Sequence, residues 1–145
     1  MSTASKPLMN SDQSGFEFAQ EMLAGEVTAA VNFDRLQKHP KYGYIIMEYL
    51  LCEEAQSVNP HTSHPNRYWH KNKRKFLSLW RVAQDLNAKL YLVNYAKKGT
   101  KHEDKILVIE VTEADENGLK GNDKKYTREE FGERFRELNR ECLES

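Results

Sequence analysis

Residues Tyr44 to Cys52 read YIIMEYLLC, an almost continuously apolar stretch that contains one carboxylate, Glu48. Short apolar runs rich in β-branched and aromatic residues are typical of strands covered on both faces, so this stretch predicts a central strand. A carboxylate inside such a strand is costly unless it is paired or bound to a metal ion. Glu48 is therefore the first candidate for a functional residue.

The sequence on either side of this strand predicts a mixed sheet. Residues 27–36 are expected to form an antiparallel partner strand, joined to the central strand through a turn cluster at residues 37–41 that Gly43 closes. Two further strands are expected at residues 89–95 and 105–111. Together with the helices described next, this order predicts an α/β or α+β fold, with a small mixed sheet of about four strands flanked by helices.

Three helices are expected. The first begins at a capping-box sequence starting at Ser14 and ends at Gly25, the second takes Asn72 as its N-cap, and the third begins at a capping box starting at Thr127. Residues 117–125 contain two glycines and are expected to form a loop. The predicted buried stripe of the second helix consists of Phe76, Leu79, Trp80, Ala83 and Leu86.

Length and composition predict one domain. The chain has 145 residues with 39% apolar content and no net charge, so residues 14–145 are expected to form a single folded unit after a polar, flexible tail at residues 1–13. The sequence has no apolar run long enough to span a bilayer, and its first residues do not resemble a signal peptide. We therefore expect a cytoplasmic protein without membrane contact, in which Cys52 and Cys142 are packed thiols rather than a disulfide.

The distribution of charge predicts an anionic partner. Residues 55–84 contain no Asp or Glu but six Lys or Arg residues, three of which surround the expected start of the second helix. Cations that contact phosphates and aromatic rings that stack on bases are typical of nucleic-acid-binding surfaces, and the choice between DNA and RNA stays open. The candidate nucleic-acid-binding residues are Arg67, Tyr68, Trp69, His70, Lys71, Lys73 and Arg74. The alternative for this segment is a loop that Tyr68 and Trp69 pin to the core, with a solvated charged face.

The histidines of the same segment allow another interpretation. His61, His64 and His70, together with Cys52, carry donor atoms that zinc favours, but their spacing fits no strong zinc signature. A polar loop whose histidines contact backbone groups or phosphate is the preferred interpretation.

A pair of carboxylates could hold a metal ion. Asp34 and Glu48 lie on opposite arms of the predicted hairpin, and strand alternation places Glu54 on the same face as Glu48. Mg²⁺ prefers a few hard oxygen ligands, so these three residues are candidate ligands for Mg²⁺ or Mn²⁺. The alternative for Asp34 is a turn residue whose carboxylate accepts hydrogen bonds from nearby amides.

These elements together resemble the PD-(D/E)XK nucleases, whose fold is the restriction-endonuclease-like fold. The resemblance covers residues 14–95 and consists of Phe33-Asp34, a turn, the apolar strand that leads to Glu48, a basic helix and the strand after it. In that family an Asp and a Glu bind the metal ion, and a lysine two residues after the Glu assists catalysis. Leu50 stands at that lysine position here. Some members supply the lysine from a neighbouring element, which implies Lys75 or Lys73 in this chain.

The resemblance implies a metal-dependent nuclease, a hydrolase that cleaves DNA or RNA with Asp34, Glu48 and Lys75 as catalytic residues. A second interpretation is a nuclease-like module that has lost catalysis and binds nucleic acid or acts as a defence-related inhibitor. A protein-binding adaptor is a third, and a homodimer is possible in each case.

Overall fold

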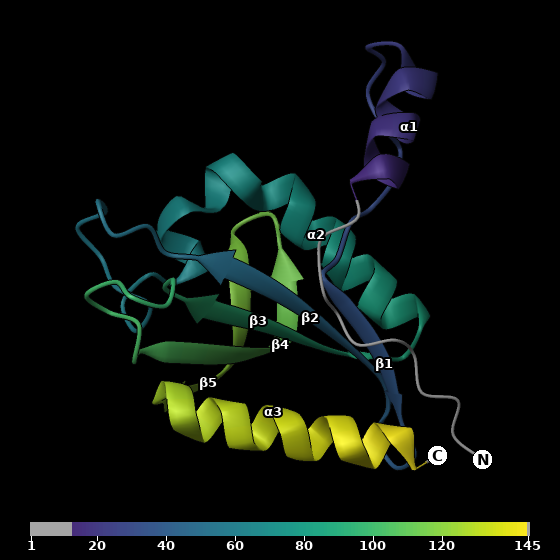
Figure 1. Cartoon of the computed structure of the whole chain (residues 1–145). Coiled ribbons are helices and arrows are strands. Elements are labelled where there is room, and N and C mark those ends of the chain that lie inside the picture. The colour runs from purple at the N-terminus through teal and green to yellow at the C-terminus, as the bar shows by residue number, and fades with distance from the viewer. Residues whose placement is uncertain (1–12, 145) are drawn as a thin grey trace.

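The computed structural model describes residues 13–144, which form a five-stranded sheet and three α-helices (Figure 1). The strands follow one another across the sheet in chain order, and all neighbours are antiparallel except β2 and β3, which are parallel. The predicted mixed sheet flanked by helices is therefore confirmed. The expected tail lies, apart from Gln13, outside the described residues. The strands are Arg35–His39 (β1), Gly43–Leu51 (β2), Lys89–Tyr95 (β3), Ile106–Asp115 (β4) and Gly118–Tyr126 (β5).

The helices form two layers on the sheet and one projection away from it. Helix α2 (Trp69–Asp85) covers one face, helix α3 (Arg128–Leu143) covers the other, and helix α1 (Ser14–Leu23) stands away from the sheet (Figure 1). A 3₁₀ turn, η1 (Pro65–Tyr68), leads directly into α2. None of the helices in residues 13–144 is long and apolar enough to cross a membrane.

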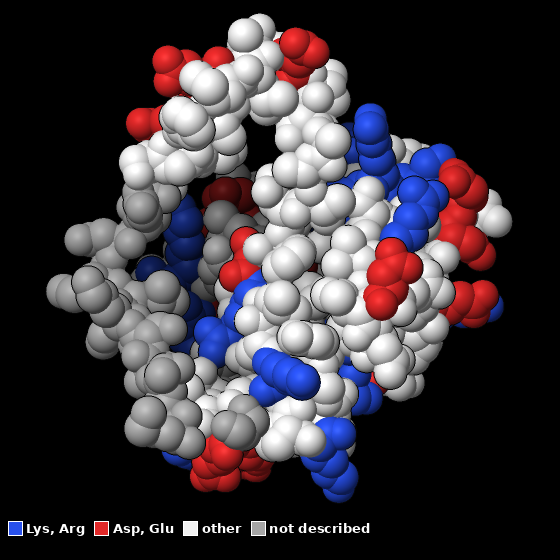
Figure 2. All heavy atoms as spheres, turned by 90° about the vertical axis from the view of Figure 1, so that its right-hand side faces the viewer, with Lys and Arg blue, Asp and Glu red and all other residues white. Residues whose placement is uncertain are grey.

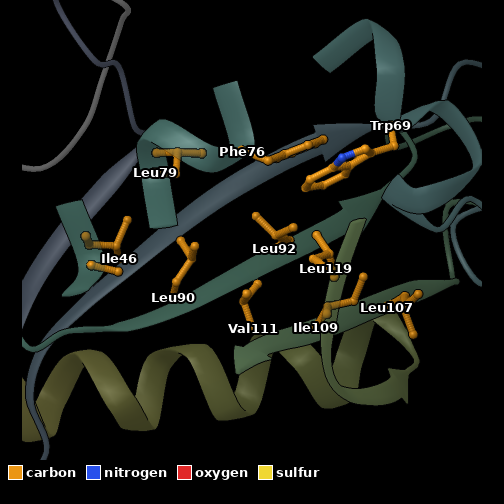
Figure 3. Packing of buried hydrophobic residues seen from close by; sticks show 11 residues of the cluster. Ile46, Trp69, Phe76, Leu79, Leu90, Leu92, Leu107, Ile109, Val111 and Leu119 are labelled. Carbon is orange, nitrogen blue, oxygen red and sulfur yellow. The ribbon is translucent and has the colours of Figure 1, made fainter. Parts of the chain in front are cut away.

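The main core lies between α2 and the sheet. Ile46, Leu90 and Leu92 project from the strands toward Phe76 and Leu79 of α2, and all five are at most 3% exposed (Figure 3). A smaller cluster beneath α3 contains Ile45, Met47 and Leu138. Because successive strand residues point to opposite faces, residues 46, 48 and 50 of β2 share the α2 side. This alternation places Glu48 under α2.

The start of α3 agrees with its predicted capping box. The Thr127 side chain accepts a hydrogen bond from the backbone N–H of Glu130, and the Glu130 side chain accepts one from the Thr127 N–H. The capping box predicted for α1 is wrong, because Ser14 is already inside the helix and its N-cap is Gln13. Helix α1 buries none of its residues, and Phe16 is 57% exposed.

The start of α2 differs from its prediction in a way that changes which residues form its first turn. The helix begins at Trp69 rather than after Asn72, because the 3₁₀ turn with Pro65 at its first position continues directly into it. The His64 side chain accepts a hydrogen bond from the N–H of Asn66 at 3.1 Å and so caps the 3₁₀ turn. Residues 73–75 therefore lie beyond the first turn of α2, and the prediction that they surround its amino end is wrong. The buried stripe is confirmed for Phe76, Leu79 and Ala83, whereas Trp80 is half-buried and Leu86 is exposed.

The strands on the two edges of the sheet also differ from the prediction. Strand β1 begins only at Arg35, and its last residue, His39, closes a turn by accepting hydrogen bonds at Nδ1 from the N–H groups of Lys41 and Tyr42. The predicted loop at residues 117–125 is in fact β5, paired with β4 through a tight turn. Gly121 is needed within this strand, because a Cβ there would collide with the carbonyl oxygen of Glu110.

Candidate active site

Glu48 is a buried carboxylate under α2. Glu48 is 4% exposed, and its Oε2 lies 2.6 Å from the Nζ of Lys75. Its other oxygen, Oε1, is buried and has no hydrogen-bond partner among the described residues. The expectation that a carboxylate within this strand must be paired is therefore met for one oxygen, and the other is left able to bind a further group.

Asp34 lies beside Glu48. It immediately precedes β1, and the first residue of β1, Arg35, pairs with Met47 of β2. Its Oδ2 accepts a hydrogen bond from the backbone N–H of Tyr49 at 2.8 Å. This contact is the amide-binding role considered as the alternative for Asp34, and it also holds the Asp34 carboxyl next to that of Glu48.

Burial raises the pKa of Glu48 above its ordinary value. The hydrogen bond and positive charge of Lys75 act in the opposite direction, and the neighbouring Asp34 carboxyl raises the pKa further. The net direction is upward, so removal of Glu48 from water outweighs its ion pair. An added cation at this position would favour the ionised form.

The angular positions of Lys73 and Lys75 around α2 determine which of the two contacts Glu48. Lys73 and Lys75 are separated by about 200° around α2, because an α-helix has 3.6 residues per turn. Lys75 therefore contacts Glu48, whereas Lys73 pairs at 2.8 Å with Glu116 in the turn between β4 and β5. Of the two lysines that the family resemblance implied, only Lys75 lies at the carboxylates.

We call the hollow around these residues the carboxylate cleft. It has a volume of about 630 Å³ and is lined by Asp34, Glu48 and Lys75, by Lys71 and Arg74 of α2, and by the chain segment before Asp34. The side of the molecule on which α1 stands has a hollow beneath α1, with basic and acidic side chains around it (Figure 2). Cations and carboxylates from three separate parts of the chain thus meet in one accessible space.

Glu54 lies outside the carboxylate cleft. It follows the end of β2, and its Oε2 accepts a hydrogen bond from the backbone N–H of Lys101 at 2.9 Å. We therefore leave Glu54 out of the candidate ligand set. In the part of the chain that the structure describes, no three His, Cys, Asp or Glu residues gather as a metal-binding cluster, so the histidines of the loop do not form one either.

The candidate nucleic-acid-binding residues divide into two groups. Trp69 is 3% exposed, stacks on Phe76 and donates its indole N–H to the carbonyl oxygen of Glu116. Its ring is part of the core, so the prediction that it stacks on a base is wrong. Tyr68 is half-buried, Lys73 is engaged by Glu116, and the exposed members are Arg67, His70, Lys71 and Arg74.

A second hollow, which we call the loop cleft, adjoins the carboxylate cleft. It has a volume of about 700 Å³ and lies between the end of β2, residues 56–63 and the first turns of α2. Lys71, Asn72 and Lys75 line both clefts, so the two are neighbours across these residues. Among residues 13–144, no Asp or Glu lines the loop cleft.

Asn94 of β3 fixes the loop that forms this cleft. It is 1% exposed, and its Nδ2 donates hydrogen bonds to the carbonyl oxygens of Pro60 and Ser63 at 3.2 and 2.7 Å. The sequence reasoning missed both this residue and the loop cleft. The signal was present, because Asn94 is a polar residue within an apolar strand, as Glu48 is.

Comparison with known proteins gives no relative for this chain. The sequence matches no protein-family model, and no curated protein and no solved structure was found to match it.

Proposed function

We propose that this protein is a metal-dependent phosphodiesterase that cleaves nucleic acid in the carboxylate cleft. The observation that supports this most is the meeting of Asp34, Glu48 and Lys75, which come from the entry to β1, the middle of β2 and the second turn of α2. Two adjacent carboxylates with a lysine beside them form a group suited to metal-assisted phosphate chemistry.

The two carboxylates fit a divalent ion such as Mg²⁺ or Mn²⁺. Glu48 Oε1 is a buried oxygen without a partner among residues 13–144, and the Asp34 carboxyl lies next to it. Mg²⁺ in proteins is commonly held by one or two carboxylates, with waters and substrate phosphates as its other ligands. When bound, such an ion polarises a phosphate and lowers the pKa of a coordinated water.

The lysines and arginine of α2 would handle the substrate backbone. The Lys75 side chain is 45% exposed, so its ammonium group can contact Glu48 and still face a phosphate in the cleft. Lys71 and Arg74 line the same space and are exposed. These cations would hold the scissile phosphate and its neighbours along the strand and stabilise the negative charge that develops on the scissile phosphate.

A second candidate function is nucleic-acid binding without catalysis. The ion pair between Glu48 and Lys75 favours it, because the ammonium group already compensates the carboxylate that a metal ion would otherwise bind. The cations of α2 would then bind phosphate, and no bond would be broken.

Cleavage assays with two variants in the cleft and one control variant test this function. Labelled single and double strands of DNA and RNA are incubated with Mg²⁺, with Mn²⁺ or with chelator. We expect metal-dependent cleavage that falls about 100-fold or more in Glu48→Gln and Lys75→Met, whereas Glu54→Gln, a carboxylate outside the cleft, keeps its activity.

The alternative outcomes have distinct meanings. Salt-sensitive binding without cleavage would favour the binding module. Failure to bind any polynucleotide at low salt would leave the protein-binding adaptor. Cleavage that Glu48→Gln leaves unchanged would show that the carboxylate cleft is not the active site.

A further inference from the structure

The loop cleft has a chemistry different from that of the carboxylate cleft. Its charged lining residues are Arg67, Lys71 and Lys75, and Arg67 and Lys71 form no ion pair with any acidic group among the described residues. Only Lys75 is engaged, by Glu48 across the boundary between the clefts. A space whose described lining carries two cations without an acidic partner, Arg67 and Lys71, and no carboxylate suits an anionic ligand.

The rest of the lining suits a flat, partly polar group. The half-buried Tyr68 ring, Leu50 and Val58 supply apolar surface, and Ser57 and Ser63 supply hydroxyl groups. The volume of about 700 Å³ is within the range of roughly 300 to 1,000 Å³ that is usual for pockets that hold small organic ligands.

The wall formed by the loop is held in place by the sheet. Asn94 binds two loop carbonyls, and Cys52 donates its thiol hydrogen to the carbonyl oxygen of Val58 at 3.3 Å. Asn59 and Thr62 bind each other within a local turn. A loop fixed in this way gives the cleft a defined shape before any ligand arrives, which lowers the entropic cost of binding.

We propose that the loop cleft holds the base and sugar of one unpaired nucleotide, whose phosphate lies at Lys71 and Lys75 on the boundary with the carboxylate cleft. This inference rests on the proposed function, because that boundary is where the scissile phosphate would lie. A base paired within a duplex cannot enter such a space unless it leaves the stack. The substrate class that follows is single-stranded nucleic acid, or a duplex with an unpaired nucleotide.

Binding to two strands of equal charge tests the inference. One probe is a short fluorescent single strand, made as DNA and as RNA, and the other is the same backbone with abasic positions in place of its bases. Affinities are measured by anisotropy in chelator, so cleavage does not contribute. We expect the wild-type protein to bind the intact strand about tenfold more tightly, since stacking on an aromatic side chain contributes this much per base.

Two variants locate the effect. Ser57 is exposed on the loop, and Ser57→Trp is expected to fill the cleft and remove the preference for the intact strand. Gln84→Trp, on the exposed side near the end of α2, adds the same ring elsewhere and is expected to keep the preference. Circular dichroism and thermal unfolding confirm that both variants are folded.

The outcomes separate this inference from the proposed function. Equal affinity of the wild-type protein for both strands, or a preference that Ser57→Trp leaves intact, would overturn the inference even if the protein cleaves nucleic acid with Mg²⁺. A preference that Ser57→Trp removes would support it even if no cleavage is found. Failure to bind either strand at low salt in chelator would overturn the inference, whereas the proposed function is judged by the cleavage assay with Mg²⁺ or Mn²⁺.

Discussion

Replacing Lys75 by Met should destabilise the protein through Glu48. The substitution removes the ammonium group at 2.6 Å from a carboxylate that is 4% exposed and whose second oxygen already lacks a partner. Breaking a fully buried ion pair costs about 3 to 5 kcal/mol, and losing a hydrogen bond to a charged group costs about 1.5 to 3 kcal/mol. Lys75 is nearly half exposed, so water can approach the freed oxygen and the lower range applies. We expect a loss of about 2 kcal/mol at pH 7.

Urea unfolding measures this loss, and α2 offers a matched control. Lys73→Met breaks an ion pair of similar length, 2.8 Å, in which the Lys73 and Glu116 side chains are 37% and 72% exposed. Exposed pairs contribute between 0 and about 1 kcal/mol, so the control should lose less than half as much. With a urea dependence of roughly 2 kcal/mol per molar, Lys75→Met should lower the midpoint by about 1 M.

A double-mutant cycle identifies the partner. In a Glu48→Gln background no charge remains to be compensated, so Lys75→Met should then cost less than about 0.5 kcal/mol. An equal cost of Lys75→Met with Glu48 and with Gln at that position would refute the reasoning, because the two residues would then be energetically independent. Equal losses in Lys75→Met and Lys73→Met would refute the role assigned to burial.

Two further predictions concern the pH dependence of stability and the packing of β5. Burial raises the pKa of Glu48 in the folded protein above its ordinary value of 4.5. The free energy of unfolding of the wild-type protein should therefore fall as the pH rises through that raised value. Across the same pH range, Glu48→Gln should become more stable relative to the wild type. Urea unfolding at a series of pH values measures this difference, and a difference that does not vary with pH would contradict it. Gly121→Ala should cost about 1 to 3 kcal/mol in thermal or urea unfolding, because its Cβ meets the carbonyl oxygen of Glu110. Gly15→Ala, which meets no atom within 4 Å, should cause no loss, and equal effects of both substitutions would be the contrary result.

The central part of the fold could be predicted because its signals are local and strong. The apolar run that ends at Cys52 is typical of a covered strand, and the structure places β2, which it forms, between two others. The capping box at Thr127 was equally clear, because both of its hydrogen bonds form between residues three apart. Periodicity also identified Phe76 and Leu79 as core residues of α2.

The errors arose where a local signal had more than one outcome. Asn72 is a good N-cap residue, but the 3₁₀ turn beginning at Pro65 already supplied a start for the helix. Gly118 and Gly121 indicated a loop, whereas the first follows a tight hairpin turn with φ at 151° and the second allows close approach of a neighbouring strand. Whether residues 118–126 form a strand or a loop depends on their pairing with β4, which the local sequence does not specify.

In the candidate site too, some residues could be identified from the local sequence, whereas others depended on how the elements pack together. The cost of burying a carboxylate identified Glu48 from sequence alone, and the short hairpin made Asp34 its natural neighbour. The choice between Lys73 and Lys75 depended on the rotation of α2 over the sheet, which is set by packing across many residues. The sequence left Trp69 open between a ring that stacks on a base and a ring that pins the segment to the core, and the structure places it in the core.

The parallel pairing of β2 and β3 has a consequence for which parts of this chain can vary in sequence and length. A crossover between parallel strands needs about a dozen residues, and the 17 residues of α2 are enough to supply it. Residues 52–64 are therefore not required for the chain to pass from the end of β2 to the start of β3. They are anchored at one end, where the Cys52 N–H donates a hydrogen bond to the Tyr95 carbonyl oxygen at 2.7 Å, and again near the other end by Asn94. Between these anchors the loop can gain, lose or exchange residues without moving Glu48. The loop residues Ser57, Val58 and Ser63, which would contact the base, and the carboxylates Asp34 and Glu48 thus occupy separate stretches of the chain, so the loop can diverge while the carboxylates are preserved.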